Sequence, residues 1–309
     1  MTQRGLVSRR RFLAGTATAG LLAASGNRLF SPALAQSAST SSYAFDVVIV
    51  GAGVAGLTAA HALSTLGRSF ILVEAASRIG GRMFTDKSKF GMAFDYGGAW
   101  IHSASRHPIF PLAQEWHFTL QYQNEAEIDR AFYNGHKLDD KDMARLQEAD
   151  NKIIKDIGAL ARQKDTATSE VLPPHPPQAE RIAATFIGPM DAAVDLRWLS
   201  TADYAGFASP EPNFLVKEGF GTIYERYGKD LPVMLNKRVR AIQYDDKGVR
   251  VLMAGDQIAA RAVIVTVSTG VLASGTIGFS PPLPTATNAA IDALPMGLLT
   301  KVPMQVRDR

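Results

Sequence analysis

A glycine-rich turn between a predicted strand and a predicted helix constrains the fold of this chain more than any other feature. Residues 45–50, FDVVIV, are almost all apolar, as in a parallel strand that is buried on both faces. The turn GAGVAG follows, and then a stretch rich in alanine and leucine that predicts a helix ending near Gly67. Residues 69–74, SFILVE, predict a second buried strand. Together these segments make one βαβ unit and predict a Rossmann-like α/β sheet.

The three glycines of this turn predict a dinucleotide site. Gly51 permits a tight turn, Gly53 lets the backbone approach a pyrophosphate, and Gly56 allows the helix to pack closely on the strand. The phosphates then meet free N–H groups at the positive end of the helix dipole. Glu74, at the end of the second strand, is placed to accept hydrogen bonds from ribose hydroxyls. Its negative charge disfavours a 2′-phosphate and therefore argues against NADP.

The first 35 residues are predicted to be a targeting segment and not part of the fold. This segment holds five arginines and no acid, and its apolar run LAGTATAGLLAA is too short and too rich in small residues to span a bilayer. The sequence ALA before Gln36 offers a cleavage site, and residues 36–44 are predicted to be a linker. SRRRFL resembles the twin-arginine signal, which predicts a bacterial protein exported already folded by the twin-arginine machinery, to the periplasm or beyond. An ordinary secretory signal is the alternative.

Composition and charge narrow the class of protein. Hydrophobic residues make up 46% of the chain and charged residues 20%, as in a globular protein. Without the five arginines of the targeting segment, 28 basic residues stand against 29 acidic ones, so a nucleic-acid partner has little support. The chain has no cysteine, which excludes disulfides, thiolate metal sites and a cysteinyl–flavin bond within it. The histidines show no metal-ligand spacing, so we expect no metal site, and the oligomeric state stays open.

The middle of the chain predicts an insertion of a different character. Residues 139–163 place apolar side chains at helical spacing with charges between them, which predicts an amphipathic helix. From residue 212 the strand pattern returns, and residues 239–267 predict three strands. We therefore predict a cofactor-binding domain over residues 45–105 and 212–283, interrupted by a helical α+β substrate domain. The latter is predicted over residues 106–211 and begins again at residues 284–309.

A second motif resembles a known family. EAASRIGGRMFT matches the E-x-x-x-R-x-G-G-R-x-x-T stretch of the flavin-containing amine oxidase superfamily, and this resemblance implies FAD as the cofactor. It also implies that Arg78, Gly81 and Arg82 contact the cofactor. The glycine lets backbone come close, and arginine can give paired hydrogen bonds to phosphate or flavin.

Two further stretches resemble the same family. DYGGAW is similar to the segment that passes the flavin ring, which implies cofactor contacts for Gly97, Gly98, Ala99 and Trp100. The following WIH is most similar to the polyamine-oxidase branch, where His102 would face the substrate cavity, although Ser103 stands where that branch often has glycine. In the later stretch NKRVRAIQY, the resemblance implies that the backbone of Val239 holds adenine.

The run MGLLTKVPM, residues 296–304, contains a lysine among apolar residues that are expected to be buried. The run resembles the family's Asn/Thr-Lys-Val pattern, in which Lys301 would hold a water near flavin N5. An apolar setting lowers the pKa of a lysine, which suits a donor beside an electron-accepting ring. Lys301 and His102 are therefore the candidate catalytic residues.

The resemblance implies a reaction and leaves its substrate open. An amine would give a hydride to flavin N5, O₂ would be reduced to H₂O₂, and the imine would be hydrolysed. A polyamine or a monoamine is the expected substrate, with an L-amino-acid oxidase or another flavin desaturase of the superfamily as alternatives. The resemblance covers about the first two-thirds of a typical member, so the C-terminal third is expected to be absent. A second alternative is therefore an inactive, truncated FAD-binding fragment.

Overall fold

The computed structural model describes residues 43–123, 131–207 and 212–305. The predicted export signal lies outside them. The strands of the described residues are β1 (Phe45–Val50), β2 (Phe70–Val73), β3 (Thr85–Asp86), β4 (Phe94–Asp95), β5 (Trp100–Ile101), β6 (Leu120–Gln123), β7 (Phe132–Tyr133), β8 (His136–Lys137), β9 (Asn213–Val216), β10 (Val233–Met234), β11 (Val239–Asp245), β12 (Gly248–Met253), β13 (Asp256–Val265) and β14 (Gly278–Ser280). The α-helices are α2 (Val54–Thr65), α3 (Ile109–Glu115), α4 (Asp140–Ala161), α5 (Gln178–Thr185), α6 (Thr201–Gly206), α7 (Phe220–Gly228), α8 (Thr269–Ala273) and α9 (Thr285–Ala293). η2 (Thr168–Val171) and η4 (Leu196–Trp198) are 3-10 helices, and η3 (Phe186–Ala192) is a π-helix.

The chain divides into two compact units, each built from separate stretches of sequence. In the described part, one unit contains residues 43–77 and 232–292 and is called here the sheet unit. The other contains residues 78–231, apart from the gaps, and 293–305, and is called the helical unit. Within the described residues, no helix is both long enough and apolar enough to cross a membrane. The domain boundaries given above from sequence stay a prediction.

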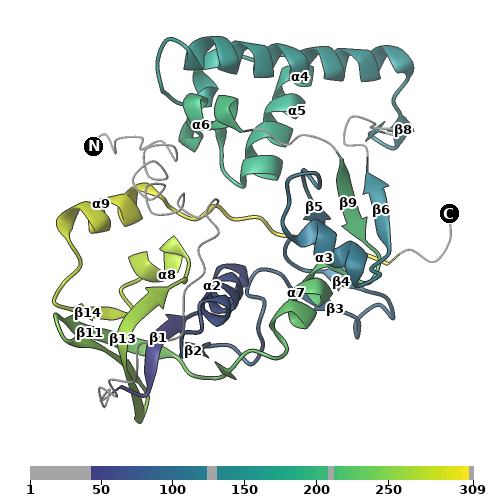
Figure 1. Ribbon diagram of the computed structural model, residues 1–309. Coiled ribbons are helices and arrows are strands. Elements are labelled where there is room, and N and C mark those ends of the chain that lie inside the picture. Colours follow the sequence, from purple (N-terminus) through teal and green to yellow (C-terminus); the bar gives the residue numbers. More distant parts are fainter. Residues whose placement is uncertain (1–42, 124–130, 208–211, 306–309) are drawn as a thin grey trace, which may run out of the picture. The chain divides into compact units, whose positions relative to one another are not determined.

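The sheet unit is built on a seven-stranded sheet with the strand order β10-β2-β1-β13-β12-β11-β14 (Figure 1). β1 lies between β2 and β13 and is parallel to both, with Val48 opposite Ile71 on one side and Val263 on the other. Val48 and Ile49 are fully buried, as expected for a strand covered on both faces. β11, β12 and β13 form an antiparallel meander. The predicted βαβ unit and the three later strands are confirmed.

Helix α2 follows the glycine turn as predicted. It runs from Val54 to Thr65 and contacts β1 and β2 through Gly56, Leu57 and Ala60, which are buried. Gly67 has a φ of +63° and donates its N–H to Ser64, so it ends the helix in the left-handed conformation that glycine adopts most easily.

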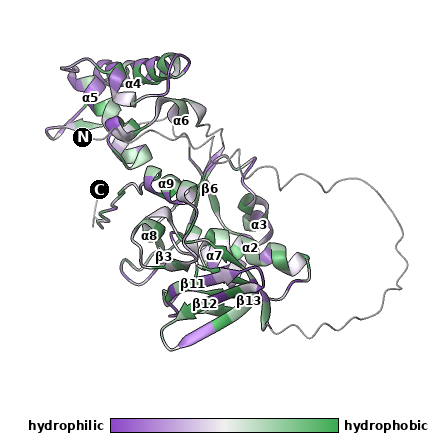
Figure 2. Ribbon diagram, turned by 90° about the vertical axis from the view of Figure 1, so that its left-hand side faces the viewer, coloured by the Kyte–Doolittle hydropathy of each residue, from purple (hydrophilic) through white to green (hydrophobic). Residues whose placement is uncertain are grey.

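The helical unit has its own core around α4. Ala149, Ile153 and Ile157 recur along one face of this helix and are buried against residues of α5 and η3. Figure 2 shows hydrophobic and hydrophilic residues alternating around α4, so the predicted amphipathic helix is confirmed. The side chain of Asp139 accepts the N–H of Asp142 at 2.8 Å and caps the helix.

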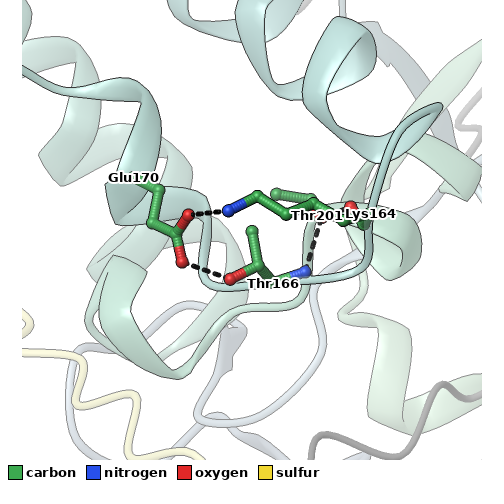
Figure 3. A network of polar contacts seen from close by, with 4 residues as sticks. All are labelled: Lys164, Thr166, Glu170 and Thr201. Atoms are coloured by element: carbon green, nitrogen blue, oxygen red, sulfur yellow. Dashed lines mark hydrogen bonds and ion pairs between the residues drawn. The ribbon is translucent and has the colours of Figure 1, made fainter.

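A network of polar contacts fastens the loop after α4 (Figure 3). The carboxylate of Glu170 pairs with Lys164 Nζ at 2.5 Å and accepts the hydroxyl of Thr166. The hydroxyl of Thr201, at the start of α6, accepts Thr166 N–H at 3.0 Å and donates to Lys164 O at 3.1 Å. Thr201 is fully buried, so its hydroxyl satisfies backbone groups that water does not reach.

The expectation that residues 296–304 are buried is wrong for their apolar side chains. Leu298 is 85% exposed and Val302 is 75% exposed. The segment has no regular secondary structure, and its recorded contacts run through its backbone and through its lysine. Leu298 N–H donates to Ala193 O at 3.0 Å, and a side chain on Gly297 would collide with that same oxygen.

Candidate functional site

The sheet unit holds one group of candidate residues, at its glycine turn. Gly51 has a φ of +103° and its N–H donates to Val73 O, which turns the chain sharply away from β1. A Cβ on Gly56 would lie 2.0 Å from Gly51 O, so only glycine allows this approach of helix to strand. Gly53 is the N-cap of α2, and because glycine has no side chain it cannot accept an N–H of the first turn. The N–H groups of the first turn of α2 are therefore left for an anionic ligand.

Glu74 is held beside this turn by backbone donors. One carboxylate oxygen accepts Ala52 N–H at 2.8 Å and the other accepts Ala76 N–H at 2.7 Å. A carboxylate has about four acceptor positions, so capacity for two ribose hydroxyls remains. The geometry fits the role that the sequence predicts for Glu74.

Thr266, just after β13, contacts this turn, and the sequence did not identify it as part of the site. Its hydroxyl is close to two acceptors, Val50 O at 2.9 Å and Gly51 O at 3.1 Å, and its N–H donates to Val50 O. The hydroxyl lies 2.8 Å from where a Cβ on Gly51 would be, so it also explains the first glycine. The only signal in the sequence was a hydroxyl residue at the end of a strand that pairs with β1.

Val239 lies at the start of β11 and is buried. Two residues earlier, Lys237 N–H donates to Glu74 O at 2.8 Å, which ties the chain before β11 to the end of β2. The pairing of β11 with β14 begins only at Ala241, so that edge of Val239 is not covered by β14. A backbone edge of this kind can read adenine, which is the role that the resemblance implies for Val239.

The helical unit holds a separate group of candidate residues, on a pair of glycine-rich loops. Gly98 N–H donates to Arg82 O at 3.2 Å, and a Cβ on Gly97 would lie 1.5 Å from that oxygen. The loops therefore touch through bare backbone. Gly81 has a φ of +58°, and Ala99 is half-buried.

The two arginines of this motif differ in what they contact. Arg78 donates to Gly81 O at 2.9 Å and to Ile79 O, and its guanidinium lies 4.1 Å from the centre of the Phe84 ring. Arg78 thus shapes its own loop and keeps further N–H donors for a ligand. The Arg82 side chain is exposed.

Lys301 belongs to the segment 296–304 and contacts the loop that contains Gly97. Its Nζ donates to Asp95 O at 2.9 Å and to Gly97 O at 2.5 Å, so two of its three N–H groups are used. Partial burial lowers the pKa of Lys301, and the negative charge of Asp95 opposes this shift. The structure therefore brings together Lys301 and Gly97, which are 204 residues apart in the sequence.

Trp100 and His102 lie next to this loop, on β5 and just after it. Their rings are 6.1 Å apart and nearly parallel, and both side chains are exposed. His107, nearby, is half-buried, and burial together with the charge of His102 lowers its pKa. Trp100 is exposed and does not belong to the core. An exposed aromatic ring beside a histidine can contact a ligand.

A further cavity in the described part is lined by none of the predicted residues. A cavity of about 350 Å³ is lined by residues of α8, β14 and α9 such as Leu272, Phe279 and Ile291. Among residues 43–123, 131–207 and 212–305, no group of three or more histidines or acids could hold a metal ion.

Comparison with known proteins assigns the chain to a family. The sequence model of the flavin-containing amine oxidoreductases matches residues 54–188 and 183–309, so the chain belongs to this family. The family's cofactor is FAD. The strands and glycine turns described above form a Rossmann-like FAD-binding part, as expected for this fold.

Individual relatives place the chain within this family only broadly. It is 28% identical over 290 residues to a probable polyamine oxidase 4 of Arabidopsis thaliana, covering 84% of this chain and 58% of the relative. It is also 28% identical to lysine-specific histone demethylase 2 of Homo sapiens, covering 84% and 34%. The chain therefore spans about three-fifths or less of these relatives.

Solved structures share the fold. A putrescine oxidase with bound putrescine superposes with a TM-score of 0.63 at 22% identity, covering 80% of this chain and 63% of that one. The cyclohexylamine oxidase of Brevibacterium oxydans gives 0.60 at 23% identity, covering 80% and 63%.

The residues present fit FAD in each unit. The sheet unit offers a side-chain-free approach at Gly56, free helix N–H groups and an anchored Glu74. The helical unit offers the bare backbone of Gly97 and Gly98 beside a partly buried lysine. Because the donors and the open backbone match what a dinucleotide needs, the cofactor assignment agrees with the geometry.

Proposed function

We propose that this protein is an FAD-dependent amine oxidase that acts on a polyamine or a related amine. The observation that carries the proposal is the position of Lys301, whose ammonium group is held by the carbonyls of Asp95 and Gly97. The names of two similar proteins, a polyamine oxidase and a putrescine oxidase, support the substrate class. FAD, when bound, accepts the hydride equivalent that leaves the α-carbon of the amine.

Lys301 has a definite task in this reaction. Two of its N–H groups are fixed, and the third stays available to hold a water beside the reacting amine. Its positive charge disfavours a second ammonium nearby, so the substrate nitrogen binds as the neutral amine. The neutral form carries the lone pair that an imine needs. Trp100 and His102 would contact the substrate from β5, because both side chains are exposed next to the same loop.

Anaerobic reduction of the bound flavin tests the role of Lys301. The protein is loaded with FAD, mixed with spermidine or putrescine without oxygen, and the loss of yellow absorbance is followed. We expect Lys301→Met to slow this bleaching about 100-fold or more while FAD stays bound, because the fixed donor is lost. Lys229→Met, at an exposed lysine after α7, is the matched control and should bleach at the normal rate. Full-speed bleaching by Lys301→Met would remove Lys301 from the mechanism.

The substrate class is tested separately by a panel. Putrescine, spermidine, spermine, a simple monoamine and several L-amino acids are each supplied with oxygen, and peroxide is measured. The proposal is supported if the polyamines give more peroxide than the other compounds. Peroxide only from L-amino acids identifies an amino-acid oxidase, and a protein that holds no flavin at all is the inactive fragment.

We also propose that residues 1–35 direct export by the twin-arginine route, since SRRRFL precedes a weakly apolar run. A reporter that is active only after export in the folded state is joined behind residues 1–44. Replacing Arg9 and Arg10 with lysine should abolish its export. Export that continues in the double variant indicates an ordinary secretory signal instead.

A further inference from the structure

Asp95 uses its side chain and its backbone for two separate sets of contacts. Its carboxylate accepts three hydrogen bonds, from Thr85 Oγ1 at 2.5 Å, from Phe220 N–H at 2.9 Å and from Gly221 N–H at 3.2 Å. The last two donors belong to the first turn of α7, where a negative charge is stabilised by the helix dipole. The backbone carbonyl of Asp95 meanwhile accepts Lys301 Nζ.

The three elements around Asp95 are packed without spare room. A Cβ on Gly221 would lie 2.5 Å from Thr85 N, and one on Gly219 would lie 2.2 Å from Thr85 Cγ2. The start of α7 is therefore in close contact with Thr85 of β3, which pairs with Asp95 of β4. Such packing leaves the segment from Asp95 to Gly97 little freedom to move.

We propose that Asp95 is a positioning residue for Lys301, because it fastens residues 95–97 to the N-terminus of α7 so that two carbonyl oxygens hold the lysine ammonium. Without the carboxylate, the segment keeps its carbonyls but loses the hydrogen bonds that fix their direction. Asp95 also acts on Lys301 through its charge, which favours the protonated ammonium and so opposes the lowering of the Lys301 pKa by burial. The inference rests on the proposed function only for its effect on catalysis.

The ammonium protons of Lys301 report on this arrangement without any cofactor. An exposed lysine ammonium exchanges its protons with water too fast to be seen by NMR near neutral pH, whereas one held by two carbonyls exchanges slowly. In protein with ¹⁵N-labelled lysine, we expect one slowly exchanging Nζ signal that disappears in Lys301→Met. We expect Asp95→Asn to speed its exchange at least tenfold.

Controls separate positioning from a general loss of stability. Asp86→Asn, at a half-buried neighbour on β3 whose carboxylate contacts Ser88 instead, should leave the Lys301 signal unchanged. In Asp95→Asn, the backbone amides of α4 should exchange at the normal rate, because a local effect does not reach that helix. If Asp95→Asn does not fold, Thr85→Val removes one of the three hydrogen bonds and should speed the exchange in the same direction, by a smaller factor.

Each result decides the proposal. Slow exchange at Lys301 that is lost in Asp95→Asn and kept in Asp86→Asn supports it. The proposal is overturned if the wild-type protein shows no slowly exchanging signal, if folded Asp95→Asn keeps it, or if exchange accelerates equally in α4. Because no amine or flavin is present, a protein that fails to oxidise amines can still pass this test. In an active enzyme, Asp95→Asn should lower kcat while the affinity for FAD is retained.

Discussion

At the scale of single residues, the candidate site depends on places where a side chain is missing. Gly97 is the sharpest case in the helical unit, since its Cα faces the carbonyl of Arg82. Backbone there cannot retreat easily, because Gly98 N–H is hydrogen-bonded to the same oxygen. Gly97 and Gly98 thus join the loop of Arg82 to the loop whose carbonyl oxygens accept the hydrogen bonds of Lys301.

Gly97→Ala should destabilise the helical unit. The added Cβ would have to displace backbone 1.5 Å away, and we expect a cost of about 3 kcal/mol or more, with loss of flavin binding. Gly278→Ala is the control, because its Cβ would meet nothing closer than 3.8 Å and its φ is ordinary. Urea unfolding compares the two. A Gly97→Ala protein as stable as the control would contradict the packing described here.

His107 gives the protein a pH-dependent stability. Burial lowers its pKa below 6.5, so between the lowered value and 6.5 the unfolded chain binds the proton more readily than the folded one. Stability should therefore rise with pH through this window, and the cost of protonation is complete below it. In His107→Gln the slope should be smaller, because glutamine binds no proton and can still accept Ile109 N–H. The exposed His136→Gln should keep the wild-type slope when urea midpoints are measured at pH 5, 6 and 7.5.

At this scale, the sequence predicted those features that depend on the backbone conformation of neighbouring residues. Gly51, Gly53 and Gly56 were predicted from spacing, because a turn and a helix start are local features. Thr266 and Asp95 were not, because their partners lie far along the chain, and Asp95 contacts a residue 125 positions away. Spacing alone cannot show such contacts, and only the fold brings them together.

At the scale of elements, α4 shows how local pattern decides structure. Its apolar residues predicted the helix to within two residues at each end, since one face of 22 residues is a strong signal. Residues 296–304 show the opposite case. Five of their nine residues are Met, Leu or Val, but the segment is held by Lys301 and by one backbone hydrogen bond, so its hydropathy predicted burial wrongly.

Gly158→Ala should stabilise α4. Gly158 lies inside the helix, where a Cβ would meet only Arg162 Nη1 at 3.9 Å, and alanine is favoured over glycine by about 0.5–1 kcal/mol in such a position. Gly188→Ala in the neighbouring η3 should do the reverse, since its Cβ would lie 2.3 Å from Leu196 Cδ1. Thermal unfolding measures both. Equal shifts in the same direction would show that the space around these glycines does not decide their effect.

At the scale of the whole molecule, the predicted cofactor residues fall into two sets. Gly51, Gly53, Gly56, Glu74 and Val239 belong to the sheet unit. Arg78, Gly81, Arg82 and residues 97–100 belong to the helical unit, as do the candidate catalytic residues His102 and Lys301. The sequence predicted both sets from motifs, and each set is assembled within its own unit. ADP contains only the groups that the first set is predicted to bind, while FAD contains the flavin as well.

Hydrogen exchange measured by mass spectrometry distinguishes the two sets in the intact protein. ADP should slow exchange at residues 51–57 and at Ala76, whose N–H lies on Glu74, and should leave residues 95–101 unchanged. FAD should slow exchange in both sets, with the new protection centred on Gly97 and Gly98, because the bare backbone there is where the flavin is expected to lie. Gly56→Ala, which blocks the helix approach, is the control and should remove the protection by ADP. Equal protection of residues 95–101 by ADP and by FAD would show that the second set does not bind the flavin, and Lys301 would then lose its proposed place beside the ring.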